Sequence, residues 1–208
     1  MSYSLREFYS QNISAAQALK RLVNGNERHL HGPSRPAWFT RADLPAITKG
    51  KQPFATILGC SDSQVSPEVV FDASPGDLFV IRIAGNVLSS EVAGSLQYAG
   101  SQLHTPLLVV LGHEGCGAVK AALAARDRGI EQCSRLQILV NTILPALPVF
   151  DSQLSPETRL SEAVKSNVLW TREQLMRSTD DRKRMLENRM KIAGAIYDIG
   201  SGRVKFLI

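Results

Sequence analysis

Residues 107–117, LLVVLGHEGCG, join an apolar run to a loop with several polar side chains, and this stretch decides the fold. Its five leading apolar residues are typical of a strand buried on both faces of a parallel sheet. Two comparable runs occur earlier, FATIL at 54–58 and LFVI at 78–81. Between the second run and the third, apolar residues at helical spacing predict a helix, at Val92, Leu96, Ala99 and Leu103. We therefore predict an α/β fold with a mostly parallel central β-sheet flanked by helices.

The amino-terminal segment has the pattern of a helical arm. From Ser14 to Leu30 apolar residues recur at helical spacing, and Ser14 suits an N-cap. The connection at 31–36 is too rich in Pro and Gly to continue a helix. We therefore expect residues 1–36 to form an N-terminal helical arm that is separate from the segment that follows it.

The second half of the chain predicts further helices and one more strand. An Ala-rich helix is expected at 118–127, and two helices are expected between residues 132 and 196. Pro145 and Pro148 mark a break between these two helices. After a Gly-rich turn, residues 203–208 alternate enough to form a final edge strand.

The composition fits one globular domain. The chain has 208 residues, 44% of them hydrophobic and 21% charged, which is ordinary for a protein with a single core. We expect one domain over 1–208, with 1–36 as its helical arm. No apolar run approaches the roughly 18 residues of a membrane span, and the chain opens without a signal-peptide pattern, so a cytoplasmic location is expected.

The formal net charge of +5 does not by itself indicate a nucleic-acid partner. Lys and Arg are interspersed with Asp and Glu, and the densest basic stretch, at 182–191, follows Asp180 and Asp181. No motif for reading nucleic acid accompanies that stretch. We interpret it as a solvated helix face and expect neither a nucleic-acid nor a membrane partner.

Potential metal ligands follow two of the predicted strands. The first strand runs into CSDSQ at 60–64, which contains Cys60 and Asp62, and the third runs into His113 and Cys116. The carboxyl ends of parallel strands meet at one edge of an open sheet, so these residues can converge. Two thiolates and one imidazole are a normal ligand set for catalytic zinc, with a fourth position left for water.

Each of these side chains also has a purely structural interpretation. A free Cys often packs as a small hydrophobe, and a lone His is usually a satisfied structural group. The pattern H-x-x-C after one strand together with C-x-D after another outweighs that interpretation. Cys133 has no such neighbours and is expected to be a structural or surface thiol. Glu114 is expected to be solvated rather than catalytic.

The sequence resembles the β-class carbonic anhydrases over most of its length. The family's C-x-D-S-R signature corresponds to CSDSQ at 60–64, and its H-x-x-C-G signature corresponds to HEGCG at 113–117. Four further segments also resemble the family's sequences: ALKRLVNGN at 18–26, PEVVFD at 67–72, GDLFVIRIAGN at 76–86 and GAIYDI at 194–199. Agreement in several separated blocks is more specific than either metal motif alone.

The resemblance implies reversible hydration of CO2 to bicarbonate and a proton by zinc-bound hydroxide. It assigns Zn2+ as the cofactor, with Cys60, His113 and Cys116 as ligands and Asp62 as the catalytic carboxylate. No organic cofactor is implied. The resemblance also implies an antiparallel edge strand on the parallel sheet, and a homodimer or higher oligomer in which the N-terminal arm embraces a partner subunit.

Gln64 departs from the family pattern, which has Arg at this position. In the family that Arg pairs with the aspartate two positions earlier and keeps the carboxylate away from zinc. Because Gln64 is neutral, we hypothesise that Asp62 spends more time as a fourth zinc ligand, which would weaken activity near neutral pH. Two alternatives stay open. An Arg from elsewhere, such as Arg82 or one from another subunit, could replace the cation, or Gln64 could hold Asp62 by an amide hydrogen bond.

Two other functions also stay open. A protein of this fold could be a catalytically weak or silent zinc protein that binds bicarbonate or a partner, and the neutral Gln64 supports that interpretation. The same site could hydrolyse a CO2-like substrate such as CS2 or COS, for which a narrow apolar entrance is expected. The intact ligand set and Asp62 favour the enzyme.

Overall fold

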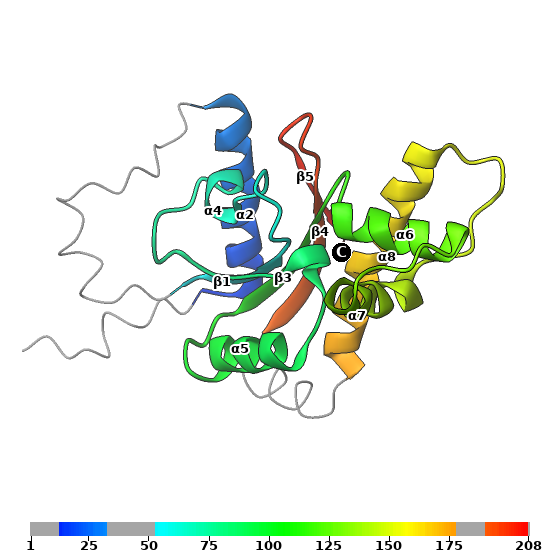
Figure 1. Cartoon of the computed structure of the whole chain (residues 1–208). Helices are drawn as coiled ribbons and strands as arrows, with labels where there is room; N and C mark the ends of the chain where they lie inside the picture. The colour runs from blue at the N-terminus through cyan, green and yellow to red at the C-terminus, as the bar shows by residue number, and fades with distance from the viewer. Residues whose placement is uncertain (1–12, 33–52, 178–189, 208) are drawn as a thin grey trace, which may run out of the picture.

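The structure is a computed structural model that describes residues 13–32, 53–177 and 190–207. These residues form a five-stranded sheet with the strand order β2-β1-β3-β4-β5 (Figure 1). The parallel strands are β1 (Ala55–Gly59), β2 (Leu78–Arg82), β3 (Leu107–His113) and β4 (Lys191–Tyr197). At the far edge β5 (Val204–Leu207) pairs antiparallel with β4. The predicted α/β fold, with a mostly parallel sheet and an antiparallel edge strand, is confirmed.

Helices cover both faces of the sheet (Figure 1). One face carries α2 (Ala15–His31) and α4 (Pro67–Val70), and the other carries α5 (Ser90–Ser101), α6 (Gly117–Arg128), α7 (Ser134–Ile143) and α8 (Pro156–Arg177). Two short 3-10 helices, η2 (Ala84–Asn86) and η3 (Leu144–Ala146), lie in the connections. Successive strand residues point to opposite faces, so Ile57 packs with the first layer and Leu58 with the second.

The helix predicted from Ser14 is confirmed as α2. The Ser14 side chain accepts a hydrogen bond from Gln17 N–H at 3.2 Å, and the Gln17 side chain accepts one from Ser14 N–H at 2.7 Å. This reciprocal capping box satisfies backbone donors that a first helical turn otherwise leaves free. The helix ends at His31, and most of the connection predicted at 31–36 lies outside the described residues.

The three apolar runs are confirmed as β1, β2 and β3, with one difference in burial. Every residue of β1 and β3 is buried, as their sequences predict. In contrast, β2 is half-buried, and its last residue, Arg82, is exposed. β2 is less buried than the other two strands because it stands at the edge of the sheet, with β1 as its neighbour.

A strand that was not predicted, β4, lies at the end of the region 132–196, in which two helices were expected. The segment 191–197 reads KIAGAIY, in which two alanines favour helix while two isoleucines and a tyrosine favour strand. In the sheet the small residues of this segment have a packing role. A Cβ placed on Gly194 would lie 2.9 Å from Val168 Cγ1 of α8, so a larger residue would push that helix away. This strand was not predicted from the sequence.

The other predictions for the second half of the chain are confirmed. The Ala-rich helix is α6, the two later helices are α7 and α8, and Pro145 lies in η3 between them. The final strand is β5. Most of the basic stretch at 182–191 lies outside the described residues, although Lys191 opens β4. Among the described helices, none combines the length and the apolar character that crossing a membrane requires.

Asn26 ties α2 to two distant parts of the chain. Its buried amide nitrogen donates to Val70 O at 3.1 Å and to Gly202 O at 2.9 Å. Its amide oxygen accepts from Val204 N–H at 2.9 Å. One side chain thus satisfies the backbone at the end of α4 and at the turn before β5, and it holds α2 against the sheet.

Replacing Asn26 should therefore destabilise the protein. Asn26→Ala removes three hydrogen bonds and leaves their backbone partners buried, so we expect the free energy of unfolding to fall by about 2–4 kcal/mol. The neighbouring Asn24 is exposed on the same helix, and Asn24→Ala is the matched control, with an expected change below about 0.5 kcal/mol. Urea unfolding at equal zinc content measures both changes. Equal midpoints for the two variants would contradict the role given to Asn26.

Candidate metal centre

The ends of β1 and β3 bring the predicted ligands together. These neighbouring strands pair in parallel with Gly59 opposite Leu111. Cys60 follows β1 directly, His113 is the last residue of β3, and Cys116 caps the start of α6. The ligand atoms of these three buried residues all lie within 4.8 Å of one another. The predicted convergence of Cys60, His113 and Cys116 is therefore observed.

The spacing of the two sulfur atoms fits a tetrahedral zinc ion. Cys60 Sγ and Cys116 Sγ are 4.0 Å apart, and both residues are free thiols. Two thiolates bound at about 2.3 Å in tetrahedral geometry stand about 3.8 Å apart. The third cysteine, Cys133, is also free but exposed, as its lack of neighbouring ligands predicts.

The orientation of His113 also suits metal binding. Its Nδ1 atom contacts Glu114 O at 3.0 Å, and because a carbonyl only accepts, Nδ1 carries the hydrogen. The other ring nitrogen, Nε2, then presents a lone pair. Nε2 is buried and meets no hydrogen-bond partner within the described part of the chain. A buried nitrogen acceptor beside two thiols is the donor arrangement that zinc uses, so the residues present fit the ion.

The three ligands shift one another's protonation. A hydrogen bond with Cys116, with smaller contributions from the nearby His113 ring and from Gly85 N–H, lowers the pKa of Cys60 to about 4 although burial opposes this change. The same hydrogen bond raises the pKa of Cys116, and burial and the charge on Cys60 raise it further. Burial disfavours a charged His113, yet the nearby Cys60 thiolate raises its pKa overall. The second thiolate therefore forms readily only when a cation is present.

The peptide at Gly85 supports the first thiolate. Gly85 N–H donates to Cys60 Sγ at 3.3 Å from a left-handed conformation with φ of 68°. A Cβ at this position would lie 2.9 Å from Ile143 Cδ1, so glycine is required both by conformation and by space. Asn167 of α8 donates to Gly85 O at 2.8 Å and fixes the turn. Asn167 was not identified in the sequence analysis. The one sign of its role in the sequence is that a polar residue occupies a position on the buried face of α8.

Asp62 and Gln64 lie in the loop beside this cluster. The Asp62 carboxylate oxygen Oδ1 accepts a hydrogen bond from Gln64 N–H at 2.9 Å, and Val65 N–H donates to Asp62 O at 3.1 Å. Asp62 is partly buried, and Gln64 is exposed. The contact between the two residues thus runs through the backbone of Gln64. The buried ligand cluster of the described residues comprises the two thiols and the imidazole.

Arg82 reaches the same loop from the end of β2. Its Nε donates to Cys60 O at 3.0 Å, and its Nη2 donates to Asp62 O at 2.5 Å. Both acceptors are backbone carbonyls. Arg82 therefore contacts the loop that carries Asp62 and does not pair with the Asp62 carboxylate in this structure.

Glu114 is anchored to α8 instead of being simply solvated. Its side chain accepts a hydrogen bond from Ser161 Oγ at 3.0 Å, and its N–H donates to Tyr197 O at 2.9 Å. Glu114 is partly exposed, and this contact fits the other role open to it, that of supplying polarity around the ligands. Because Glu114 O also accepts from His113, these bonds fix the loop that orients the imidazole.

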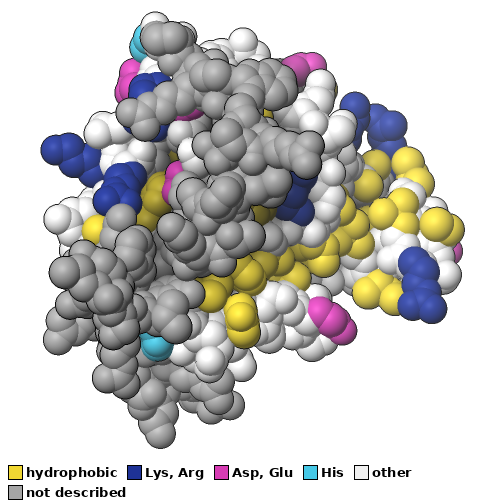
Figure 2. All heavy atoms as spheres, turned by 90° about the vertical axis from the view of Figure 1, so that its left-hand side faces the viewer, with side chains coloured by type: hydrophobic (Ala, Val, Ile, Leu, Met, Phe, Trp, Pro, Cys, Tyr) yellow, Lys and Arg dark blue, Asp and Glu magenta, His cyan; other side chains and the backbone are white. Residues whose placement is uncertain are grey.

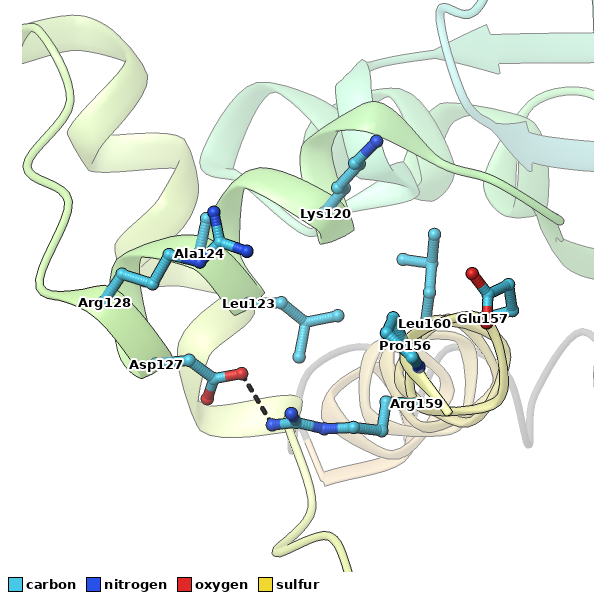
Figure 3. A pocket seen from close by; sticks show the side chains of 9 residues that line it. All are labelled: Lys120, Leu123, Ala124, Asp127, Arg128, Pro156, Glu157, Arg159 and Leu160. Carbon is cyan, nitrogen blue, oxygen red and sulfur yellow. Dashed lines mark hydrogen bonds and ion pairs between the residues drawn. The ribbon is translucent and has the colours of Figure 1, made fainter. Parts of the chain in front are cut away.

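A hollow of about 540 Å3 lies apart from the cluster, between α6 and α8 (Figure 3). Leu123 and Leu160 line it, and an ion pair of 2.6 Å between Asp127 and Arg159 crosses one side. None of the three buried ligands lines this hollow. It therefore does not belong to the metal centre.

Comparisons with known proteins agree with this site. A family model described as carbonic anhydrase matches residues 55–204. Carbonic anhydrase 2 of Mycobacterium tuberculosis is 39% identical over 196 residues, with 92% of each chain covered. The carbonic anhydrase of Mycolicibacterium smegmatis is 36% identical, covering 93% of this chain and 94% of that protein.

Solved structures share the fold. One of two tetrameric β-carbonic anhydrases of Sordaria macrospora matches with a TM-score of 0.71 at 24% identity, covering 92% of this chain and 94% of the other. A β-carbonic anhydrase of Aspergillus fumigatus matches with a TM-score of 0.69 at 26% identity, covering 79% of each chain. The family model and the relatives match this chain, and the two thiols and the imidazole lie together at the sheet edge. This chain therefore belongs to the β-class carbonic anhydrase family.

Proposed function

We propose that this protein catalyses the reversible hydration of CO2 to bicarbonate and a proton, with zinc held by Cys60, His113 and Cys116. The observation that carries the proposal is the buried Nε2 of His113, which has no partner among the described residues and lies with two free thiols. Family membership supports the same reaction, because the relatives compared above are named carbonic anhydrases.

The ligand residues determine what a bound ion can do. Two thiolates neutralise the charge of a zinc dication, and the neutral imidazole completes three corners of a tetrahedron. A zinc ion with one open position supplies a Lewis acid that lowers the pKa of water to about 7. The bond from His113 Nδ1–H to Glu114 O keeps the imidazole in the tautomer that binds metal.

We propose Asp62 as the catalytic carboxylate of this reaction. One of its oxygens, Oδ1, accepts from Gln64 N–H, and the other can accept a hydrogen bond from a water in the site. Gln64 is proposed as the residue that positions Asp62, through the backbone N–H. A carboxylate with one oxygen held by a neutral donor keeps its second oxygen available as a hydrogen-bond acceptor, and bulk buffer or a surface group then removes the proton.

A closed form of the site is the competing proposal. If the carboxylate of Asp62 gave up the Gln64 N–H, it could become a fourth zinc ligand and block the position for water. The neutral side chain of Gln64 favours this state over a site with Arg at that position, because a cation there would hold the carboxylate back. A protein mainly in the closed form would be a weak enzyme, or a silent protein that binds bicarbonate or a partner. Turnover of CS2 or COS is the remaining alternative.

We also propose that the chain forms one domain that assembles with copies of itself. The edge strand β2 leaves half-buried apolar residues beside the exposed Tyr98, and Phe79 contacts that ring at 6.1 Å. Figure 2 shows hydrophobic side chains gathered in a band on this side of the molecule. In the described part of the chain β2 is an edge strand, and such an edge is a natural place for pairing between chains. Tetrameric relatives of the same fold support a homodimer or higher oligomer, with 1–36 as the proposed arm.

Loss of a metal ligand should abolish activity. We expect Cys116→Ser to lose zinc and to reduce CO2 hydration at least about 100-fold, because the third ligand fixes both charge and geometry. Cys133→Ser is the matched control, since Cys133 is exposed and outside the cluster. Stopped-flow CO2 hydration with zinc analysis measures both variants. A wild-type protein that is fully loaded with zinc but inactive from about pH 6.5 to 9 would favour the silent binding protein.

Zinc binding should release protons. Cys116 and His113 have raised pKa values, so both tend to hold protons that zinc must displace, whereas Cys60, at about 4, is already ionised near neutral pH. Lowering the pH therefore favours the metal-free protein. We expect about one to two protons to be released per zinc near pH 7, with affinity falling as pH falls. Titration calorimetry in buffers of different ionisation enthalpy counts these protons, and a pH-independent affinity would contradict the expected linkage.

Adding a cation at position 64 should increase activity. In Gln64→Arg a guanidinium beside Asp62 disfavours the closed form, and we expect CO2 hydration near pH 7 to rise about three- to tenfold. Ser63 is exposed on the same loop, and Ser63→Arg adds an equal charge at the wrong position as a control. The measurement is stopped-flow hydration from about pH 6.5 to 9 on proteins with equal zinc content. No gain at any pH would count against the closed form.

A further inference from the structure

We propose that Arg82 is a positioning residue, which holds the loop of Asp62 in the open form of the site. Its guanidinium binds the carbonyls of Cys60 and Asp62, one a zinc ligand and the other the proposed catalytic residue. The inference rests on the proposed function, because it assigns a role in keeping the fourth metal position free. The carboxylate itself is not the partner of Arg82.

The contact begins where the sheet ends. Gly59, the last residue of β1, pairs with Arg82, and Ile83 N–H donates to Gly59 O at 3.0 Å. Beyond Gly59 the chain leaves the strand, and the next carbonyls have no strand partner. The side chain of Arg82 takes over as donor, to Cys60 O at 3.0 Å and to Asp62 O at 2.5 Å. The planar guanidinium thus extends the β1–β2 hydrogen bonding into the ligand loop.

The fork shape of the side chain matters for this role. One guanidinium spans two carbonyls two residues apart, with different nitrogens as donors. A lysine ammonium is a single point charge and cannot reproduce this planar pair of bonds. Charge on the donor makes such bonds stronger than neutral ones. Arg82 therefore fixes the direction of the Cys60–Asp62 backbone, as well as bringing a positive charge near it.

The consequence for Asp62 follows from its other bonds. Asp62 O accepts from both Arg82 and Val65 N–H, and Asp62 Oδ1 accepts from Gln64 N–H. These donors hold the backbone and the carboxylate of Asp62 within one tight turn. Without Arg82 the turn loses its two bonds to β2, and the carboxylate is freer to leave Gln64 N–H and reach the metal. Position 64 of this chain holds a neutral side chain. The arginine that restrains the loop is therefore Arg82, on the neighbouring strand β2.

The experiment compares Arg82→Met and Arg82→Lys in the cobalt-substituted and zinc-loaded full-length protein. In the cobalt protein, an open site changes its visible spectrum with pH as the bound water ionises, and a carboxylate-closed site does not. We expect Arg82→Met to shift the spectral midpoint up by about one pH unit or more, and to lower CO2 hydration about tenfold near pH 7. Arg82→Lys should recover less than half of either effect.

Two further variants complete the test. Arg203 is exposed just before β5, at the opposite edge of the sheet, and Arg203→Met removes an equal charge without touching the loop. It should leave both readouts unchanged. Adding Gln64→Arg to Arg82→Met should raise activity by a larger factor than Gln64→Arg raises it in the wild type, because the new cation replaces a lost restraint.

Several results would overturn the proposal. If folded, cobalt-substituted Arg82→Met has the same spectral midpoint as the wild type, Arg82 has no positioning role. If Arg82→Lys recovers both the midpoint and the activity in full, the positive charge alone matters. If Arg82→Met does not fold, Arg82→Lys is tested in its place. A cobalt spectrum of Arg82→Lys that titrates like that of the wild type would then overturn the proposal. Absence of CO2 hydration in zinc-loaded wild type would instead refute the proposed reaction, while the cobalt titration would still decide the role of Arg82.

Discussion

The parallel pairing of β1 with β3 is the constraint on which the metal centre depends. It sets Gly59 opposite Leu111, so the chain leaves both strands at the same edge of the sheet with Cys60 and His113 side by side. Both strands are buried at every residue and lie inside the sheet. Ligands fixed to such strands keep their geometry better than ligands on free loops.

The packing of α8 connects this core to the ligand loops. A Cβ on Gly112 would lie 2.5 Å from Val168 Cγ2, so the helix rests directly on the backbone of β3. That close approach brings Asn167 within 2.8 Å of Gly85 O, whose turn supports the Cys60 thiolate. It also brings Ser161 to Glu114. Small residues in the strands therefore determine where polar groups of a helix meet the metal centre.

The charges of the site are distributed over two environments. The buried cluster of Cys60, His113 and Cys116 gains its second negative charge only with a cation present, since the first thiolate raises the pKa of the second thiol. Asp62 lies in the more exposed loop, where backbone N–H groups and the guanidinium of Arg82 supply the restraint. The buried ligands are thus separated from the Asp62 carboxylate, which lies in a partly exposed loop.

The sequence by itself determined the fold class and the ligand set. Apolar runs long enough for buried strands placed β1, β2 and β3, and the motifs that follow two of them identified Cys60, His113 and Cys116. The missed strand β4 mixes residues that favour helix with residues that favour strand, and the role of its small residues is visible only against Val168 of α8. The tertiary structure alone decided the tautomer of His113, the anchoring of Gly85 by Asn167 and the carbonyl partners of Arg82. The last two depend on contacts between residues far apart in the chain, and the tautomer of His113 depends on the conformation of the loop at Glu114; local patterns of hydrophobicity and charge encode neither.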